Sequence, residues 1–566
     1  MSSADLIQQT APDPMATPVA SSFPVRWEHP DDAEHVWIQD RMHAPDPITP
    51  LEQVLTELVY AGMSATAERY EVPVRIKCRR INTFLYWAVV PSVVPPAEIE
   101  AQLERSNAKF RAVFARIGDI WREELLPEVQ DHIHYWETFD LTGASLPAVL
   151  AHVDQTVTRH ARLYDLHFRV VTPKHLVLSL FEELYRDLFP LDDSLTAFRL
   201  LQGFENKTIE TDRELWRLSQ VARANPAVRQ ALLDHAASDV IGVLESNAAA
   251  GTFNDCLREF LLAYGRRSGK PFQLSAPAWI EDPTPVLENL QSYLAQPERD
   301  LDAEVRATIA EREHLVARAR ERLAQQSPAI REEFEFLLKA AQEASVVSED
   351  HNFWIDYRAA YELRRVFLEV GRRFVEAGVL DEAEDVLFLY LDEIRQTGTT
   401  LVGVDRRPLV EQRRLELRDF STVVPPLALG TLPPGPPPDS PLARALDKFL
   451  GSPPPASAPD AVRGHPGSSG TVTGRVRVLR SLAEADKLQP GDVLVAETTV
   501  STWTPLFATA AAVVTNTGGV LSHCAVVARE YGIPAVVGTG TATEILRDGQ
   551  LVEVDGDAGI VRVLIP

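Results

Sequence analysis

The stretch from Val423 to His465 divides the chain into two parts of different character. It contains most of the runs VVPPLALGTLPPGPPPDSPL and GSPPPASAPDAVRGHPGSSG, separated by a segment that could form a short helix. Such a density of Pro, Gly and Ser is unsuited to a hydrophobic core, and prolines stiffen a linker towards polyproline II at about 3.1 Å per residue. We therefore predict a linker over residues 423–465, which lets the part that follows move between distant sites.

Residues 23–422 are predicted to form one mainly α-helical domain. Apolar residues recur at three- and four-residue spacing in stretches such as PLEQVLTELVYAGMSATAERY and RAAYELRRVFLEVGRRFVEAG, as in helices with one buried face. An early run, VPVRIKCRRINTFLYWAVV, predicts a β-rich patch within it. Residues 1–22 are polar and contain proline, and we expect them to be disordered.

Residues 466–566 have the pattern of a small α/β domain. Short segments rich in β-branched residues predict strands, and SLAEADKL, PLFATA and SHCAVVAREY predict helices between them. The predicted strands are TVTGRVRVLR, DVLVAE, AAVVTN, IPAVVG, LVEVDG and GIVRVL. The sequence thus predicts a multidomain chain, with a large helical domain followed by a small α/β domain.

The composition and net charge of the chain argue against some classes of binding partner. The chain has 566 residues and a formal net charge of −25, which argues against nucleic acid and anionic membranes because both require basic surfaces. Its three cysteines, Cys78, Cys256 and Cys524, show no C-x-x-C spacing, so neither a disulfide framework nor a metal site is predicted. The N-terminus lacks the pattern of a secretion signal and no apolar run is long enough to span a membrane. We therefore expect a cytoplasmic protein.

The stretch TNTGGVLSHCAVVAREYGIPAVVG, which begins at Thr515, places His523 at the predicted start of a helix. A helix N-terminus favours an anion by about 0.3–1 kcal/mol, and a phosphorylated imidazole would gain roughly −1.5 to −2 charges by analogy with other phosphorylated side chains. A plain polar helix cap is the alternative interpretation of this histidine. The phosphate is predicted to contact the residues around this turn and one arginine further along the helix, namely Thr515, Thr517, Gly518, Gly519, Ser522 and Arg529.

The last hundred residues resemble the mobile phosphohistidine domain of the phosphoenolpyruvate-utilising enzymes. The resemblance is carried by T-x-x-G-G-x-x-S-H, A-R-E, G-I-P-A-V-V-G and the closing VDGDAGIVRV. It implies a swivelling β/β/α domain in which His523 takes a phosphoryl group from ATP at one domain and delivers it at another. Leu521 stands where the dikinases of this family have threonine, so regulation through that threonine is not expected.

The helical part resembles the acceptor-binding domain of the rifampin phosphotransferase type. This resemblance is carried by the segments HAPDPITPL, LLQGFENKTIETDRELW and FLLAYGRRSGKPFQLSAPAWIEDP. The family shows Y-G-H-R where this chain has Tyr264-Gly265-Arg266-Arg267. Where the family has an arginine and a lysine that face the transferring phosphoryl group, this chain offers Arg358 and Glu362.

The helical spacing of EDHNFWIDYRAAYELRR suggests an acceptor pocket without reference to the family. His351, Arg358 and Glu362 follow one another at offsets of seven and four, which predicts one helix face with an aromatic stripe beside it. His351 could deprotonate an alcohol or phenol and Arg358 could neutralise phosphoryl oxygens. The substrate-binding candidates are Glu362 and the tyrosines of the stripe, Tyr357 and Tyr361, while His43, Arg266 and Arg267 are expected to be structural or surface residues. A solvated helix face beside an aromatic core is the alternative.

The chain contains no G-x-x-x-x-G-K-[ST] loop, and no segment of it resembles the family's nucleotide-binding domain or its barrel that binds phosphoenolpyruvate. ATP and Mg²⁺ are therefore expected on a partner subunit and none on this chain, as in the split phenylphosphate synthases. The predicted function is phosphoryl transfer through His523 to a small aromatic or hydrophobic hydroxyl compound. Two alternatives remain open: a non-catalytic binding protein that keeps the fold, and a dehydratase that acts through a transient phosphate ester.

Overall fold

The computed structural model describes residues 23–565 except 28, 271–272, 296–300, 432–438 and 452–460. The predicted disordered segment 1–22 therefore lies outside the described residues. The described chain forms a helical body and a C-terminal α/β domain, as predicted. The helices are α1 (Pro50–Arg69), α2 (Ile99–Phe114), α3 (Ile117–Asp119), α4 (Leu126–Thr138), α5 (Leu146–Leu188), α6 (Thr196–Arg199), α7 (Lys207–Ala224), α8 (Pro226–Asp234), α9 (Ala237–Ser246), α10 (Gly251–Tyr264), α11 (Thr284–Ala295), α12 (Leu301–Leu323), α13 (Pro328–His351), α14 (Ala360–Glu376), α15 (Leu391–Thr400), α16 (Arg407–Ser421), α17 (Pro441–Leu450), α18 (Thr504–Phe507), α19 (His523–Glu530) and α20 (Ala542–Ile545).

The 43-residue helix α5 is the axis of the helical body. Helices α1, α13 and α14 pack along it and share one hydrophobic core with it. Pro173 interrupts its hydrogen-bond ladder, because proline has no N–H to donate to the carbonyl four residues earlier. The hydroxyl of Tyr70 donates to that carbonyl, the oxygen of Arg169, at 2.7 Å. The helix therefore continues through the proline without leaving a buried carbonyl unpaired.

The predicted β-rich patch is confirmed as a small antiparallel sheet against the body. Its strands are β1 (Val36–Gln39), β2 (Val74–Ile81), β3 (Phe84–Pro91) and β4 (Ala428–Gly430), in the order β2-β3-β1-β4. Strand β4 lies within the stretch predicted as linker, yet it pairs with β1. The sheet thus ties the start of that stretch to the N-terminal end of the body.

A second tie within the predicted linker is helix α17, which packs on α5. Lys448 donates to carboxylates of Glu182 at 2.6 Å and Glu183 at 2.9 Å, and Arg444 binds Glu183 at 3.0 Å. Two parts of the predicted linker, 432–438 and 452–460, lie outside the described residues. Because α17 is an amphipathic helix bound to the body, an extended tether does not describe residues 441–450.

The C-terminal domain contains an eight-stranded sheet in the order β5-β12-β11-β7-β8-β9-β10-β6. Strands β7 to β10 run parallel in the centre, while β5, β6, β11 and β12 pair antiparallel at the sides. All six predicted strands are present. The strands are β5 (Ala461–Arg463), β6 (His465–Ser468), β7 (Thr471–Leu479), β8 (Asp492–Ala496), β9 (Ala512–Thr515), β10 (Ala535–Val537), β11 (Leu551–Asp555) and β12 (Ile560–Ile565).

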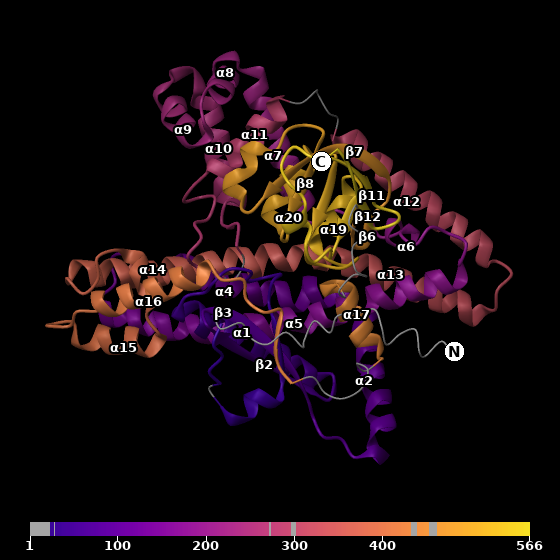
Figure 1. Ribbon diagram of the computed structural model, residues 1–566, viewed down its shortest axis with the longest axis horizontal. Helices are drawn as coiled ribbons and strands as arrows, with labels where there is room; N and C mark the ends of the chain where they lie inside the picture. The colour runs from indigo at the N-terminus through magenta and orange to yellow at the C-terminus, as the bar shows by residue number, and fades with distance from the viewer. Residues whose placement is uncertain are drawn as a thin grey trace.

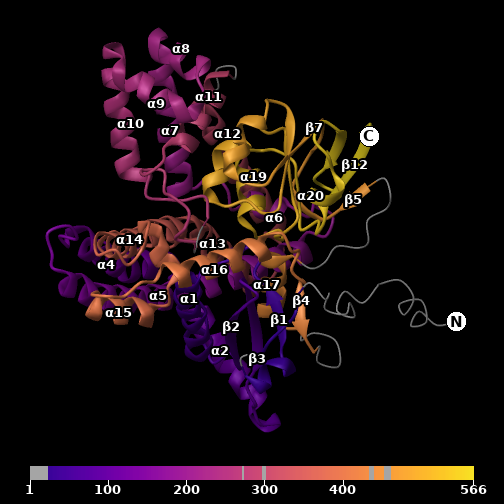
Figure 2. The same cartoon turned by 60° about the vertical axis from the view of Figure 1, so that its left-hand side comes forward.

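The C-terminal domain sits on the helical body beside α13 (Figures 1 and 2). It lies between α12 on one side and a lobe formed by α7 to α11 on the other, a lobe that has its own hydrophobic core. Helix α19 is on the side of the domain that faces the body. This arrangement brings His523 to the junction of the two parts.

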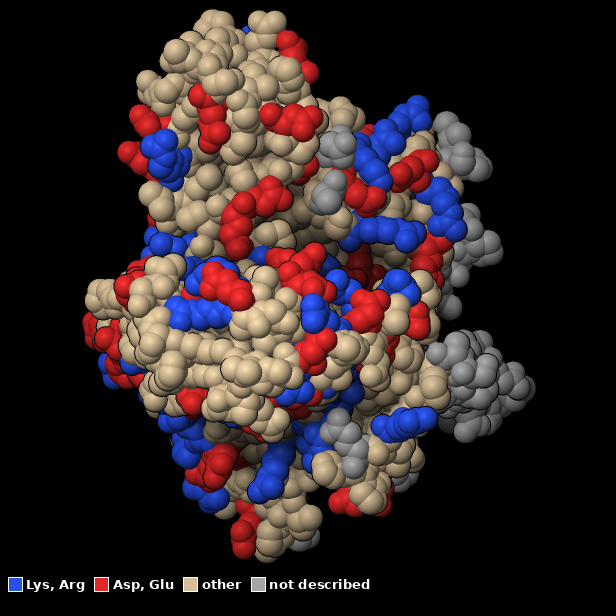
Figure 3. All heavy atoms as spheres, turned by 90° about the vertical axis from the view of Figure 1, so that its left-hand side faces the viewer, with Lys and Arg blue, Asp and Glu red and all other residues tan. Residues whose placement is uncertain are grey.

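The surface carries charges of both signs. On the face drawn in Figure 3, acidic and basic side chains of the described residues are intermixed, and no broad basic area forms there. Among the described helices none is long and apolar enough to cross a membrane.

Candidate functional site: a cavity between the two domains at His523

His523 occupies the predicted position at the start of a helix. Strand β9 ends at Thr515, Gly518 adopts a φ of +92°, and α19 begins at His523. Glycine suits this turn because other residues are strained at such a φ. Ser522 has the backbone geometry of an N-cap, although its side chain makes no capping hydrogen bond. The turn therefore presents His523 in the first helical turn, towards the helical body.

Two groups approach the imidazole of His523. Its Nδ1 lies 3.5 Å from Oε2 of Glu349, in the last turn of α13, and its Nε2 lies 3.4 Å from the hydroxyl of Thr504. Glu349 is 4% exposed and also accepts a hydrogen bond from Thr208 at 2.8 Å. Burial raises the pKa of Glu349, but His523, Thr208 and Lys174 outweigh it and lower that pKa to about 2. An ionised carboxylate of the helical body thus faces the histidine.

His523 forms part of the wall of a cavity of about 180 Å³. The remaining walls come mostly from the helical body, with Thr498, Thr499 and the glycine turn contributed by the C-terminal domain. Trp87, Phe168 and Phe449 supply aromatic surface. The two domains therefore enclose a space of small-molecule size beside the histidine.

The glycine turn is held by the C-terminal end of α17. The amides of Gly518, Gly519 and Leu521 donate to the carbonyls of Leu450, Phe449 and Lys448, at 3.1, 2.9 and 2.9 Å respectively. The predicted phosphate contacts of these glycines remain a prediction, and in this arrangement their amides are bound to α17. We call this contact between α17 and residues 518–521 the α17 clip.

A Gly519→Ala substitution is expected to break the α17 clip. A Cβ at this position would lie 2.2 Å from the carbonyl oxygen of Lys448, and forced overpacking of this kind costs about 1–3 kcal/mol. Hydrogen exchange should become faster at residues 518–521 and in α17, and the melting temperature should fall. Gly242→Ala is the matched control, because a Cβ there meets no atom within 4 Å. Unchanged exchange in Gly519→Ala would show that the clip does not form.

Three of the other predicted phosphate contacts, Thr515, Thr517 and Arg529, donate hydrogen bonds to backbone carbonyls. Thr515 donates to the carbonyl of Thr517 at 2.8 Å, and Thr517 donates to the carbonyl of Glu497 at 3.1 Å. Arg529 donates to the carbonyls of Ala525 and Val520. Thr517 and Ser522 line the cavity, whereas Thr515 and Arg529 do not.

Of the three residues predicted on one helix face, only His351 reaches the cavity. Residues Asn352–Ala359 form a π-helix between α13 and α14. A π-helix has more residues per turn than an α-helix, so the offset of seven from His351 to Arg358 no longer returns to the same face. Arg358 donates to Glu137 at 2.8 Å and Glu362 pairs with Arg365 at 2.5 Å, both outside the cavity wall. The prediction that His351 shares a face with these two residues was therefore wrong, while Arg358 and Glu362 both lie near Arg266, which binds Glu137 at 3.0 Å and is 3.7 Å from Glu362.

The same π-helix decides which aromatic and acidic side chains line the cavity. Tyr357 lies in its wall as expected, but Tyr361 does not. Asp356, which the spacing did not single out, lines the cavity and is 7% exposed. Arg266, the departure in Y-G-R-R, binds Glu137 at 3.0 Å, and Arg267 is buried over the rings of Trp279 and Phe353. Those two arginines are structural, as expected.

Three buried polar side chains of α5 were not predicted from the sequence as site residues. His167, Lys174 and His175 all line the cavity, although they stand in the largely apolar run LHFRVVTPKHLVLSL. Burial lowers the pKa of Lys174 to about 8 despite the attraction of Glu349 and Asp356. The sequence does contain a signal for these residues. They are polar at positions where the helical period predicts apolar residues, and they stand near a proline inside the helix.

His43 was expected to be structural or exposed, and it lies instead in the cavity wall. Its Nδ1 is 3.0 Å from Oδ1 of Asp40, whose other oxygen accepts from the hydroxyl of Tyr60 at 2.7 Å. Burial lowers the pKa of His43, but the charge of Asp40 outweighs it and raises that pKa above its usual value. Asp40 and Tyr60 thus orient a histidine of increased basicity at the cavity.

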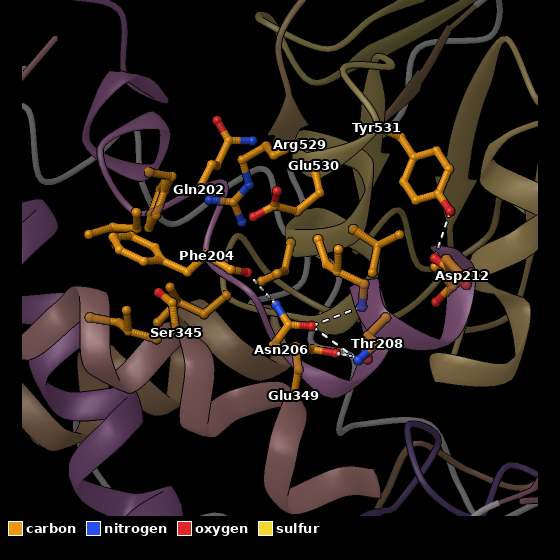
Figure 4. A pocket seen from close by; sticks show the side chains of 18 residues that line it. Gln202, Phe204, Asn206, Thr208, Asp212, Ser345, Glu349, Arg529, Glu530 and Tyr531 are labelled. Carbon is orange, nitrogen blue, oxygen red and sulfur yellow. Dashed lines mark hydrogen bonds between the residues drawn. The ribbon is translucent and has the colours of Figure 1, made fainter. Parts of the chain in front are cut away.

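Further contacts fix the C-terminal domain on the body around a second pocket, which Glu349 also lines (Figure 4). Tyr531 donates to Asp212 at 2.6 Å, and the amide of Gly203 donates to Glu530 at 3.2 Å. The guanidinium of Arg529 lies 4.2 Å from the ring centre of Phe198. Arg529, predicted from the sequence to contact the phosphate, here contacts the helical body.

The contacts of Asp212 predict that the free energy of unfolding depends on pH. Burial raises the pKa of Asp212 to about 7, although the hydrogen bond from Tyr531 opposes the shift. Because the pKa in the folded protein exceeds that of an unfolded aspartate, the folded state retains this proton and loses stability as the pH rises through 7. We expect Asp212 to contribute a loss of about 1 kcal/mol in the free energy of unfolding between pH 6 and pH 8. Glu530 and Asp356, whose pKa burial also raises to about 7, add to this loss.

Thermal unfolding at these two pH values checks this expectation. Asp212→Asn should remove about 1 kcal/mol of this dependence and leave the part that comes from Glu530 and Asp356, since the amide does not titrate. Asp239→Asn, an exposed residue of α9, should leave the profile unchanged. An Asp212→Asn protein with the full pH dependence of the parent would contradict the assignment.

Comparison with known proteins gives matches in both parts of the chain. A family model described as the fourth domain of rifampicin phosphotransferase matches residues 167–349, and one described as the mobile domain of PEP-utilising enzymes matches residues 488–559. The first match contains α5 from His167 and α13 up to Glu349. The second contains the glycine turn and His523.

Three relatives show the extent of the similarity. A chondramide synthase of Chondromyces crocatus is 40% identical over 97% of this chain, and an uncharacterised phosphotransferase of Bacillus subtilis is 29% identical over 94% of it. A rifampicin phosphotransferase of Streptomyces sviceus is 31% identical over 63% of this chain. The chain spans only 14%, 62% and 40% of the lengths of these three relatives.

Proposed function

We propose that this chain, which belongs to the family of PEP-utilising enzymes, carries a phosphoryl group on His523 to a small hydroxyl compound bound by the helical domain. One observation carries the proposal: His523 stands in the wall of a cavity of about 180 Å³ whose other walls come mostly from the helical domain. A histidine that served only as a helix cap would need no such cavity. The similarity to a rifampicin phosphotransferase and to a second phosphotransferase supports the same type of reaction.

We assign to Glu349 the role of stabilising the imidazole of His523 as the leaving group in phosphoryl transfer. Its ionised carboxylate, 3.5 Å from Nδ1 of His523, favours the tautomer with the proton on Nδ1 and leaves Nε2 to carry the phosphoryl group. During transfer the P–N bond to Nε2 breaks and a P–O bond to the acceptor forms. A proton on Nδ1, facing the charge of Glu349, makes the neutral imidazole the leaving group, much as an aspartate fixes the tautomer of the histidine in a hydrolase triad.

Two further groups of the cavity complete the proposed chemistry. His43, oriented by Asp40 at 3.0 Å, takes the proton of the attacking hydroxyl. Lys174 supplies the positive charge for the phosphoryl oxygens, the role that the sequence suggested for Arg358. His351, the base expected from the sequence, remains an alternative base in this scheme.

The acceptor is a small molecule in this proposal. An apolar cavity of roughly 150 Å³ accommodates benzene, so the space beside His523 suits a compound of about that size or one group of a larger compound. The aromatic surface of Trp87, Phe168 and Phe449 suits a ring or an aliphatic chain. The polar side chains of the same wall suit a hydroxyl group.

The phosphoryl donor in this proposal is ATP, with Mg²⁺, on a partner subunit. No segment of the 566 residues has the phosphate-binding loop G-x-x-x-x-G-K-[ST]. In this proposal His523 leaves the cavity to be loaded elsewhere, and the α17 clip, which binds the glycine turn in the present arrangement, then opens.

Labelling with γ-phosphate of ATP tests the donor arrangement. The purified chain and labelled ATP are incubated with and without a lysate of the source organism, and acid-labile, base-stable label is measured on the chain. We expect label only with the lysate, and a nucleotide-binding protein in the active lysate fraction. Label on the purified chain alone would contradict a donor in trans, and no label under either condition would contradict the carrier role.

A further inference from the structure

Three buried side chains meet in the wall of the cavity without satisfying one another. His167 comes from α5, His351 from the end of α13 and Asp356 from the π-helix, and they are 6%, 3% and 7% exposed. Nδ1 of His167 lies 3.4 Å from one oxygen of Asp356, and Nε2 of His351 lies 3.8 Å from the other. One nitrogen or oxygen atom from each of the three falls within 4.8 Å of the other two.

These separations fit a shared metal ion better than direct hydrogen bonds. Hydrogen bonds between nitrogen and oxygen are about 2.7–3.2 Å long, so 3.8 Å is too long and 3.4 Å is marginal. Ligands about 2.1 Å from a tetrahedral metal ion lie roughly 3.4 Å apart. Only small side-chain shifts would place all three atoms at that spacing.

Two nitrogen atoms of the cluster, Nδ1 of His167 and Nε2 of His351, are suited to binding a ligand. Nδ1 of His167 has no hydrogen-bond partner among the described residues, and a buried polar atom without a partner is costly. The oxygen of Val347 lies 2.7 Å from Nδ1 of His351. That carbonyl fixes a proton on Nδ1 and leaves the lone pair of Nε2 for the cluster, as partners of metal-binding histidines do.

We propose that His167, His351 and Asp356 form a binding site for one divalent first-row metal ion such as Zn²⁺. Two histidines and one carboxylate are a common ligand set for such ions, and they leave at least one coordination position open. That position would face the cavity that also contains His523. The ion would polarise the acceptor hydroxyl or neutralise phosphoryl oxygens, and His43 would then be the base. Binding itself does not depend on the proposed phosphoryl transfer.

The positive charge of Lys174 weakens binding of the proposed metal ion. Its ammonium is buried, lines the same cavity and donates to the hydroxyl of Ser348 at 3.2 Å, so its charge repels a cation in the cluster. Removing this charge in Lys174→Met should therefore tighten metal binding by about tenfold, since like charges in a buried cavity repel each other more strongly than they do in water. A cation bound at surface carboxylates far from Lys174 would not respond to this variant.

Titration with Co²⁺ alone tests the site, because tetrahedral Co²⁺ absorbs visible light with an intensity that depends on its ligands. After chelation and dialysis, the chain should bind one equivalent with intense bands. Asp356→Asn and His351→Gln should lose these bands while keeping the circular dichroism of the parent. His152→Gln is the matched control, because His152 is also buried on α5 but lies outside the cluster.

Three results would overturn the proposal. They are no binding above the level of a chelator-treated control, binding that persists in both cluster variants, and binding that is unchanged in Lys174→Met. If His351→Gln does not fold, Asp356→Asn and Lys174→Met still decide the question, since they change charge with little change of shape. Phosphoryl labelling of His523 without any Co²⁺ or Zn²⁺ site would leave the proposed function standing and reject the metal site alone.

Discussion

His523→Ala is expected to abolish phosphoryl incorporation into the chain. No other described histidine combines the first turn of a helix, a preceding glycine turn and the wall of the cavity between the domains. Alanine removes the nucleophile, so label from ATP in the presence of lysate should fall to background, a loss of at least 100-fold. The protein should remain folded, because the substitution lies at a junction and leaves the core residues of both domains unchanged.

His134→Ala is the control for this result. His134 is exposed on α4, so its loss should leave the label unchanged. The label itself should be lost in acid and resist base, which distinguishes a phosphorylated histidine from phosphoserine or phosphothreonine. Acid-labile label that survives in His523→Ala would place the phosphoryl group on another residue.

Glu349→Gln is expected to separate loading from delivery. Glu349 belongs to the helical domain and lies 3.5 Å from Nδ1 of His523, so in the proposed mechanism it acts on delivery and not on loading. Loss of its charge should slow departure of the phosphoryl group on the order of 10²-fold, the usual effect of removing one electrostatic contact in an active site. Loading by a partner should be unchanged, because it takes place away from the helical domain.

A chemical donor allows this to be measured without the partner. The chain is phosphorylated with phosphoramidate, the reagent is removed, and the phosphohistidine signal is followed by ³¹P NMR as small alcohols and phenols are added. Glu343→Gln is the matched control, since Glu343 lies on the same helix but pairs with Arg122 at the surface. Equal rates for Glu349→Gln and the parent would contradict the role of Glu349.

The fold was largely predictable from local patterns. Period-3.6 and β-branched runs predicted the helical body, the β-rich patch and six of the eight described strands of the C-terminal domain, because each pattern is local. The division at 423–465 was harder to predict in detail. Strand β4 and helix α17 lie inside that run, and they form because β1 and α5 offer them partners far away in the sequence.

The candidate site was predictable on one side only. His523 and its turn occupy consecutive positions, so the local sequence contains the whole signal. The opposite wall combines residues more than 100 positions apart, such as Asp40, Lys174 and Asp356. The π-helix at Asn352–Ala359 also changed the register in which Arg358 had been placed beside His351. A single irregular turn is enough to exchange one predicted site residue for another.

The central claim is that the phosphoryl group on His523 passes to a hydroxyl compound in the cavity. Its most direct test is a single turnover of chain loaded with phosphoryl group, mixed with a panel of small alcohols and phenols and followed by ³¹P NMR and mass spectrometry. We expect the phosphohistidine signal to be replaced by that of an acid-stable phosphate monoester, or by a dehydrated product with free phosphate, for at least one compound. Release of inorganic phosphate alone, at the same rate with every compound and with none, would contradict the claim.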